Sequence, residues 1–323
     1  MKQNHYLRSR CSICFVLLAC LVGAVWAGPF MGQYKGTFYP DSVSKMNATC
    51  EVVDEGEGNY RVVIHGKSRN SLQEGAYIEL YGKQSGESLA ISGRTGGYDW
   101  QGEIKNGLLT AKSSYGQHFE LEKIESRSPR AGMKPPEEAI ILLPYQEGVK
   151  PDMSSWTNAE WKALDDGSIE IVPGKGPNKT KQQFDNIKFV HMEFKLPLEP
   201  LARGQARANG GVFVCGAYEV QILDSFGLIH TSGDCGAVYN VARARRNACL
   251  PPETWQSLDI MFRASRLDQN GKAKDSPQIT VFLNSVRIHN DFEIPNPKDC
   301  ERGPIRLEDE GHKIQFRNIW IVE

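Results

Sequence analysis

The sequence predicts an all-β protein built from two antiparallel units. Short runs rich in β-branched and aromatic residues recur along the chain, turn sequences containing glycine or proline separate them, and no helical periodicity of any length follows residue 27. A single sheet of so many strands does not stay open, so the larger unit is expected to be a two-sheet antiparallel sandwich.

Length and composition are those of an ordinary globular protein. The chain has 323 residues, of which 40% are hydrophobic, and its formal net charge is −1. This length accommodates one large β domain and a smaller one. The near-neutral charge balance gives no sign of a basic surface for nucleic acid.

Residues 1–27 have the pattern of a secretory signal peptide. A basic start is followed by an apolar run from Ile13 to Val25, too short to span a membrane, and by the cleavage site Val25-Trp26-Ala27. We therefore expect an exported protein, periplasmic or secreted, whose remaining 35 basic and 39 acidic residues give a net charge of −4. The weaker alternative is a lipoprotein acylated at Cys20.

Five cysteines follow this leader: Cys50, Cys215, Cys235, Cys249 and Cys300. In an oxidising compartment one or two disulfides are expected among the last four, with Cys50 as the odd cysteine, and the sequence does not determine the pairing. No Cys-x-x-Cys pair occurs among the five, which argues against a zinc-cysteine site.

Residues 28–125 predict a small antiparallel β-meander of five or six strands. Alternating runs begin near residues 59, 76, 89, 100, 108 and 118, and Asn106-Gly107 between two of them is a strong hairpin signal. Residues 126–136 hold three prolines and three basic residues, a composition typical of a semi-rigid linker. The second domain is then expected over residues 137–323.

The polar groups of this second domain are concentrated in residues 209–227. Two strand-like runs joined by Cys215-Gly216-Ala217 predict a hairpin, and alternation places Glu219 and Gln221 on one face. Asp224 joins this row only if a one-residue bulge lies near Leu223. Polar residues on the wet face of a sheet need no function. Two carboxyls and an amide between glycine turns, however, also suit acid–base chemistry or metal ligation.

A second alternating run, residues 188–194, carries His191 and Glu193 on one face. Pairing between this strand and the Glu219 strand would bring both side chains next to Glu219 and Gln221. Further strands are expected over residues 139–143, 169–172, 255–263, 278–289, with a hairpin at Asn284-Ser285, and 314–322.

Six motifs follow one another in the second domain. They are Asn209-Gly210-Gly211-Val212-Phe213, Tyr218-Glu219-Val220-Gln221-Ile222-Leu223-Asp224-Ser225, Gly236-Ala237-Val238-Tyr239, Trp255-Gln256-Ser257-Leu258-Asp259-Ile260, Gly303-Pro304-Ile305-Arg306-Leu307 and Phe316-Arg317-Asn318-Ile319-Trp320-Ile321. In this order they resemble the 3-keto-disaccharide hydrolase family, and the resemblance runs from about Pro136 to the C-terminus. The N-terminal meander and linker also look like a region that precedes this domain in members from planctomycete-like bacteria.

The resemblance implies a concanavalin A-like jelly roll whose concave sheet holds sugar, and an enzyme that cleaves 3-keto-glycosides. In such a substrate the C3 ketone acidifies the C2 hydrogen, so a base can remove it and the glycosidic bond at C1 breaks by elimination, with water adding back for net hydrolysis. The implied roles are catalysis for Glu219, Asp224 and His191, substrate binding for Gln221, Asn209, Tyr239, Asp309 and Arg317, and ligation of a divalent metal (Ca²⁺, Mn²⁺ or Zn²⁺) for Glu219, Gln221 and Glu193.

The sequence departs from the family pattern at two motifs. The usual Asn-Ser-Gly is Asn209-Gly210-Gly211, and the usual Leu-Gln-Asp-His-Gly is Leu307-Glu308-Asp309-Glu310-Gly311, with His312 displaced by two places. Glu310 in place of the family histidine motivates the alternative function, a non-catalytic carbohydrate-binding or cell-envelope module on the same fold.

Overall fold

The computed structural model of the chain describes residues 28–65 and 77–323. Its regular elements are β-strands apart from one 3-10 turn, η1 (Gly204–Ala206), so the all-β prediction is confirmed. The predicted signal peptide and Cys20 lie outside the described residues. Within the part of the chain that is described, no helix has the length and apolar character needed to cross a membrane.

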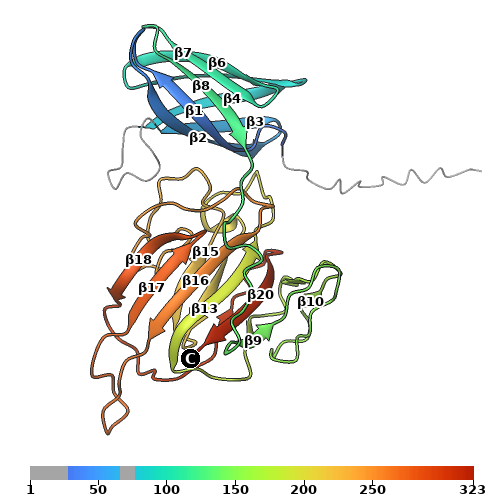
Figure 1. Cartoon of the computed structure of the whole chain (residues 1–323), viewed down its shortest axis with the longest axis vertical. Helices are drawn as coiled ribbons and strands as arrows, with labels where there is room; N and C mark the ends of the chain where they lie inside the picture. The colour runs from blue at the N-terminus through green and yellow to red at the C-terminus, as the bar shows by residue number, and fades with distance from the viewer. Residues whose placement is uncertain (1–27, 66–76) are drawn as a thin grey trace, which may run out of the picture.

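The first unit is a closed barrel of eight antiparallel strands, drawn in blue to green in Figure 1. Each strand pairs with the next, and β8 pairs back with β1. Asn106 and Gly107 have φ values of 52° and 77° in the β6–β7 turn, as the hairpin signal predicts. The strands are β1 (Gly32–Tyr39), β2 (Met46–Gly56), β3 (Asn59–His65), β4 (Tyr77–Ser85), β5 (Ser88–Thr95), β6 (Tyr98–Lys105), β7 (Leu108–Ser113) and β8 (His118–Ile124).

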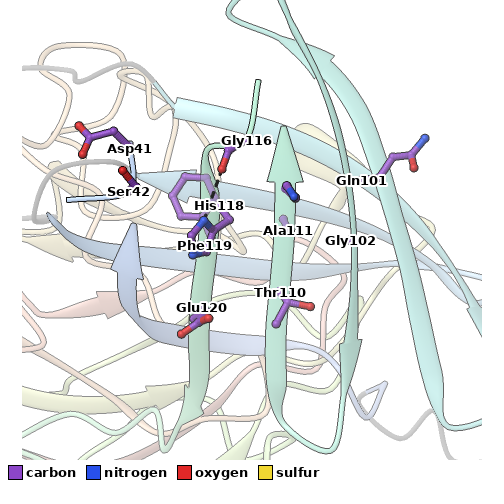
Figure 2. A pocket seen from close by; sticks show the side chains of 11 residues that line it. Asp41, Ser42, Gln101, Gly102, Thr110, Ala111, Gly116, His118, Phe119 and Glu120 are labelled. Carbon is purple, nitrogen blue, oxygen red and sulfur yellow. Dashed lines mark hydrogen bonds between the residues drawn. The ribbon is translucent and has the colours of Figure 1, made fainter. Parts of the chain in front are cut away.

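The barrel has eight strands where the sequence pattern predicts five or six. The two strands that it misses, β1 and β2, precede the first predicted run. Apolar and polar residues do alternate along β2 from Met46 to Val52, but its residues from Cys50 to Asp54 are all buried, the acidic ones included. One face of this strand contributes to the barrel core, and the end of the strand lies against the second unit. On the outer wall, strands β6 to β8 form the floor of a groove of about 470 Å³, bordered by the β1–β2 loop (Figure 2).

The second unit consists of two antiparallel sheets packed face to face, so the prediction of a two-sheet antiparallel sandwich is confirmed. The larger sheet has the order β10-β11-β20-β13-β16-β17-β18, with β9 also paired to β20, and the smaller has the order β12-β19-β14-β15. The larger sheet contains β9 (Ile140–Leu143), β10 (Lys162–Ala163), β11 (Ile169–Glu170), β13 (Asn186–Lys195), β16 (Gln256–Arg263), β17 (Gln278–Leu283), β18 (Val286–Glu293) and β20 (Gln315–Val322). The smaller contains β12 (Asn178–Lys179), β14 (Gly210–Val214), β15 (Tyr218–Ile222) and β19 (Arg306–Leu307).

One hydrophobic core lies between these sheets. Val212 and Val220 of the smaller sheet and Val190 and Ile260 of the larger belong to the same buried cluster. Because side chains alternate along a strand, the residues between them point to the two outer faces of the sandwich. The predicted polar residues therefore divide according to the sheet that carries them.

Residues 126–136, predicted to be a linker, pack against the outer face of the larger sheet. Ser128 Oγ lies 2.7 Å from Ser257 Oγ, Arg130 Nη1 lies 2.8 Å from Asp259 Oδ2, and the Gly132 amide donates to Glu193 Oε1 at 2.6 Å. The segment thus covers polar groups of the sheet besides joining the two units.

An arginine-rich contact joins the barrel to the sandwich. Arg207 Nε donates to Asp224 Oδ2 at 2.6 Å, and its Nη2 donates to the Asp54 carbonyl of the barrel at 3.1 Å. Arg61 of the barrel donates to the Gly227 carbonyl at 2.8 Å, and Arg203 donates to Glu55 Oε2 at 2.5 Å. These bonds fix the end of β2 against the loops on either side of the β14–β15 hairpin.

We expect Arg207→Met to lower the free energy of unfolding by about 3–5 kcal/mol, because it leaves the buried Asp224 carboxylate without its partner. Urea denaturation of the full chain measures this. Arg94→Met is the control, since the Arg94–Asp99 pair is mostly exposed and its loss should cost less than about 1 kcal/mol. Equal losses in the two variants would contradict the prediction.

Candidate functional site

Glu219 and Gln221 lie on the outer face of the smaller sheet, as alternation predicts. In the β14–β15 pairing, Phe213 is opposite Glu219 and Gly211 is opposite Gln221, while Val212 and Val220 face the core. Cys215 and Gly216, with φ values of 55° and 62°, form the predicted turn. The hairpin therefore presents one carboxyl and one amide to the outside of the sandwich.

Gly211 provides the space that the Glu219 carboxyl occupies. A Cβ built on Gly211 would lie 2.4 Å from Glu219 Oε1, well inside van der Waals contact. Any larger residue at position 211 would displace the carboxyl from the sheet surface. Gly211 is thus a requirement of the Glu219 position rather than of the turn.

The buried amide of Gln221 connects Glu219 to two neighbouring amides. In the orientation that satisfies its hydrogen bonds, the nitrogen donates to Glu219 Oε1 and to the Gly210 carbonyl, each at 2.8 Å. Its other end lies 3.0 Å from the Asn209 side-chain amide and 2.9 Å from that of Gln205. Glu219, Gln221, Asn209 and Gln205 therefore form one polar network.

The segment from Gly236 to Tyr239 runs along the free edge of β15. The main-chain N–H of Gln221 donates to the Ala237 carbonyl at 2.9 Å, and the main-chain N–H of Tyr239 donates to the Glu219 carbonyl at 3.1 Å. A Cβ placed on Gly233 would lie 3.3 Å from Gln205 Nε2 and 4.0 Å from Tyr239 Cε2, so both side chains lie beside that glycine. Tyr239 therefore borders the network.

A second carboxyl approaches Glu219 from the other side of the hairpin. β19 pairs with β14, and the next residue, Glu308, donates its amide to the Gly211 carbonyl at 3.0 Å. The Glu308 and Glu219 side chains lie close enough for each to shift the pKa of the other. Arg306 Nη1 lies 3.5 Å from Glu308 Oε1, and its guanidinium lies over the Phe213 ring, 3.5 Å from the centroid.

This arrangement changes the acidity of Glu219. Burial and the negative charge of Glu308 raise its pKa from 4.5 to about 7, although Arg306 opposes the shift. Burial also raises the pKa of Glu308, against the same arginine. Near neutral pH the pair can therefore hold one proton between two carboxyl groups, which provides a base and an acid in one place.

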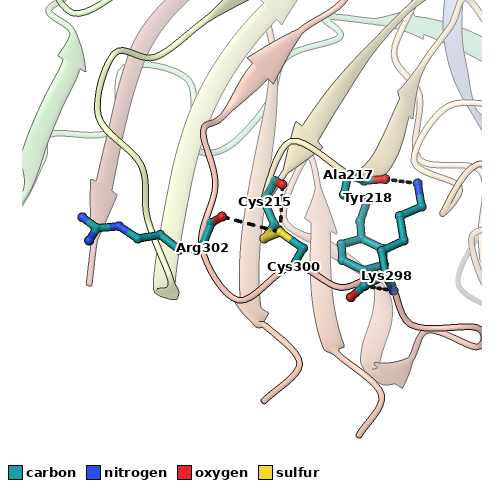
Figure 3. The surroundings of a disulfide bond; sticks show 6 residues. All are labelled: Cys215, Ala217, Tyr218, Lys298, Cys300 and Arg302. Carbon is teal, nitrogen blue, oxygen red and sulfur yellow. Dashed lines mark hydrogen bonds between the residues drawn. A yellow bond between two sulfur atoms is a disulfide. The ribbon is translucent and has the colours of Figure 1, made fainter. Parts of the chain in front are cut away.

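A disulfide fixes the tip of the hairpin. Cys215 and Cys300 are bonded, which joins the β14–β15 turn to the segment that leads into β19 (Figure 3). Beside the bond, the Lys298 amide donates to the Tyr218 hydroxyl at 2.7 Å and Lys298 Nζ donates to the Ala217 carbonyl at 2.6 Å. The expectation of a disulfide among the last four cysteines is confirmed. Cys50, Cys235 and Cys249 are buried outside any disulfide.

Asp224 does not belong to the Glu219 row. The β14–β15 register runs without a shift from the turn to Ile222, so the bulge that Asp224 requires is absent. Asp224 is 3% exposed, and its carboxylate is paired with Arg207 and accepts a hydrogen bond from the Phe226 amide at 3.2 Å. The predicted position of Asp224 is wrong, because the chain leaves the strand after Ile222 to meet the barrel.

His191 and Glu193 lie on the opposite side of the sandwich from Glu219. Their strand, β13, pairs with β16 and β20, so the predicted pairing with the Glu219 strand is wrong. Both side chains are fully buried beneath residues 126–136. His191 Nδ1 lies 2.6 Å from Asp259 Oδ1 and Nε2 lies 3.5 Å from Glu193 Oε1, while the ring stacks on Trp320.

Arg317 and Asp309 also lie apart from the Glu219 network. Arg317 Nε donates to Glu193 Oε2 at 2.8 Å, and its guanidinium lies between the rings of Tyr145 and Trp255, at 4.3 and 4.1 Å from the centroids. The Asp309 carboxylate accepts from the amides of Gly176 at 2.8 Å and Gly311 at 3.0 Å. Arg317 therefore belongs to the buried His191 cluster, and Asp309 stabilises a loop.

The predicted metal ligands do not fit one ion. Glu219 and Gln221 lie on the outer face of the smaller sheet, whereas Glu193 lies on the far face of the larger one and already accepts bonds from Gly132, Asn318 and Arg317. Across residues 28–65 and 77–323, no group of three or more His, Cys, Asp or Glu side chains is arranged to hold a metal.

The sequence prediction misses Glu308 and Gln205. Glu308 directly follows the Gly303–Leu307 motif, where the family usually has glutamine, so its place in that motif is the signal that could have identified it. Gln205 belongs to the short η1 turn, and no periodicity connects it with the hairpin. Only the folded chain brings it to Gln221.

The comparisons with known proteins agree with this picture of the second unit. The 3-keto-α-glucoside-1,2-lyase-like domain family matches residues 147–322. The chain belongs to this family. The match begins about ten residues later than the resemblance seen in the motifs, and it leaves the barrel outside.

Two solved structures from Parabacteroides distasonis ATCC 8503 resemble the chain, both described as candidate glycosyl hydrolases. The first is 30% identical, with a TM-score of 0.52, over 58% of this chain and 84% of the other. The second is 16% identical, with a TM-score of 0.43, over 61% of this chain and 97% of the other. A search of curated proteins finds no match.

The buried His191 cluster gives a pH-dependent contribution to stability. Burial lowers the pKa of His191, but hydrogen bonds and charges from Asp259 and Glu193 outweigh burial and raise it above 6.5. The stabilisation is therefore complete below the unfolded-state pKa and is lost as pH rises through the folded-state value.

We expect the difference in unfolding free energy between the wild type and His191→Gln to be larger at about pH 6 than at about pH 9. Urea denaturation at both pH values measures the difference. His118→Gln is the control, since that histidine is on the barrel surface. A His191→Gln difference that stays constant or grows towards pH 9 would contradict the prediction.

Proposed function

We propose that this protein cleaves 3-keto-glycosides at the site formed by Glu219, Glu308, Gln221, Asn209 and Tyr239. Membership of the family and the likeness to a candidate glycosyl hydrolase support a carbohydrate-active function of hydrolase type. The observation that supports cleavage of 3-keto-glycosides in particular is the Glu219–Glu308 pair. Because the pKa of Glu219 is raised to about 7, its carboxylate is a base suited to proton transfer near neutral pH.

In the proposed reaction the Glu219 carboxylate takes the proton from C2 of the keto sugar. The electron pair moves to the C3 oxygen, which becomes an enolate. The carbonyl then reforms, a double bond forms between C1 and C2, and the C1–O bond breaks. The leaving oxygen takes a proton from a carboxyl of the pair or from water. Addition of water across the double bond gives net hydrolysis.

The amides around the pair would stabilise the enolate. The side-chain amides of Asn209 and Gln205 lie 3.0 and 2.9 Å from that of Gln221, so the three amides are packed together before the substrate arrives. Preorganised donors of this kind stabilise charge that develops in a transition state without reorganising. Tyr239, at the edge of the network, would contact the sugar ring.

A non-catalytic carbohydrate-binding module is the second candidate function. Glu310 stands where the family has a histidine, and its negative charge also helps to raise the pKa of Glu219. A site with three neighbouring glutamates would bind a polyhydroxylated ring through acceptors even without turnover. Binding of a 3-keto-glucoside without product would favour this function.

We also propose that the protein is exported. The Cys215–Cys300 disulfide supports this, since such bonds persist in oxidising compartments. Fractionation of the native host with an antibody to the protein tests it. Recovery from the cytoplasm alone would contradict export.

Glu219→Gln should lower kcat for cleavage of 3-keto-trehalose by about 10²–10⁴-fold, the usual contribution of a general base. Released sugar is quantified by liquid chromatography and mass spectrometry. Glu301→Gln, an exposed glutamate in the loop before β19, is the matched control and should retain wild-type rates. Full activity in Glu219→Gln would exclude Glu219 as the base.

Glu308→Gln should move the pH dependence of the reaction. With Glu219 as the base, kcat/KM rises with pH and levels off above the pKa of about 7. Removing the Glu308 charge lowers that pKa, so the rising limb should shift to lower pH. The kcat/KM profile of both proteins between about pH 5 and about pH 9 measures the shift. An unmoved limb, or one moved to higher pH, would contradict the coupling of the two carboxyls.

A further inference from the structure

The barrel carries a cluster of aromatic side chains at the end that faces away from the sandwich. Register places Tyr39 opposite His118, and Tyr98 begins β6 at the same end. The sandwich contacts the other end, where the β2–β3 turn and Asp54 lie. Tyr115, in the β7–β8 turn, completes the cluster and is 78% exposed.

These rings are held in place by one another. Tyr39 and His118 stack with centroids 4.4 Å apart and planes 10° apart, and Tyr98 meets Tyr115 edge to face at 5.1 Å. The Tyr39 hydroxyl also donates to Glu120 Oε2 at 3.4 Å. Exposed aromatic faces that are fixed before binding lose little conformational entropy when a ligand covers them.

Two grooves flank this cluster. The first, of about 470 Å³, has Gln101, Thr110 and Glu120 on its floor and Asp41 at its border (Figure 2). The second, of about 480 Å³, is lined by Tyr98, Tyr115 and Gln117 among others. They meet around Pro40 and Asp41 on one side and Gly116 and Gln117 on the other. Both volumes lie in the range of small-molecule sites.

The polar groups in the grooves select a neutral ligand with many hydroxyls. One side-chain amide, two hydroxyls, two carboxylates, one histidine and one lysine line the first groove, so donors and acceptors are mixed and neither charge dominates. A polyanion would meet Asp41 and Glu120, and a polycation would meet Lys112. A peptide strand has no sheet edge to join, because the barrel is closed.

From these features we infer that the outer end of the barrel binds a neutral polysaccharide chain. The apolar C–H face of a sugar ring stacks on Tyr115, which Tyr98 supports edge to face, because His118 and Lys45 already cover the Tyr39 ring. The sugar hydroxyls bond to Gln101, Thr110 and Gln117. The site is separate from Glu219, and its occupancy is independent of whether the sandwich turns over substrate. Bound at this end, the barrel would hold the sandwich close to a glycan.

Affinity electrophoresis of the full chain tests the inference. The protein carries Glu219→Gln, so that no sugar is consumed, and runs in native gels containing dextran, soluble starch, laminarin or xyloglucan. At least one of these neutral polysaccharides should retard it. The apparent affinity should fall at least tenfold in Tyr115→Ala and in Tyr98→Ala, two tyrosines that line the second groove, whereas Tyr81→Ala, an exposed tyrosine on β4 outside both grooves, should leave it unchanged.

Several results would overturn the inference. They are the absence of retardation by all four polysaccharides, an equal loss in Tyr81→Ala, or full retardation of the Tyr98→Ala/Tyr115→Ala double variant, which would place binding on the sandwich. Retardation by dextran sulfate alone would show charge attraction instead. Gln101→Ala separates loss of binding from loss of folding. The Gln101 side chain is exposed, so this variant should have the melting temperature of the parent protein and still be retarded less in the same gels.

Discussion

The buried ion pair between Arg207 and Asp224 is the interaction on which the candidate site depends. The two residues bracket the β14–β15 hairpin, and the Asp224 amide also donates to the Arg207 carbonyl at 3.3 Å. Arg207 reaches the Asp54 carbonyl of the barrel as well, so one guanidinium closes the base of the hairpin and anchors it to the first unit. The Cys215–Cys300 disulfide holds the opposite end. Glu219 lies between these two constraints.

Such constraints matter because the site itself opposes folding. A carboxyl whose pKa is raised to about 7 binds its proton more tightly in the folded chain, so its ionisation between about pH 4.5 and about 7 destabilises the folded state. The Gly211 contact adds a further cost, since glycine in a strand loses more conformational freedom than other residues. The ion pair and the disulfide offset these costs, which allows Glu219 to keep an energetically unfavourable position beside a second carboxyl.

The sequence predicted the parts of this structure that depend on local spacing. Alternation placed Glu219 and Gln221 on one face, and Asn106-Gly107 and Cys215-Gly216 marked turns that exist. Local spacing did not, however, determine which strands pair with one another. His191 has the same alternation as Glu219, but β13 joins the other sheet, and Glu308 reaches Glu219 only through the pairing of β19 with β14.

The two polar clusters of the sandwich show why residue type alone did not separate structure from function. Around Glu193, an amide, an arginine, an asparagine and a histidine surround one carboxylate, and their bonds lower its pKa against the effect of burial. The Glu193 carboxylate is stabilised in its charged form, so it is a weak base near neutral pH. Glu219 instead faces a second carboxyl, and the proton that they share is available for transfer. The pattern of strands was enough to predict the fold class. To separate the two carboxyls, one has to know that Glu193 is paired with Arg317 whereas Glu219 lies beside a second carboxyl, that of Glu308.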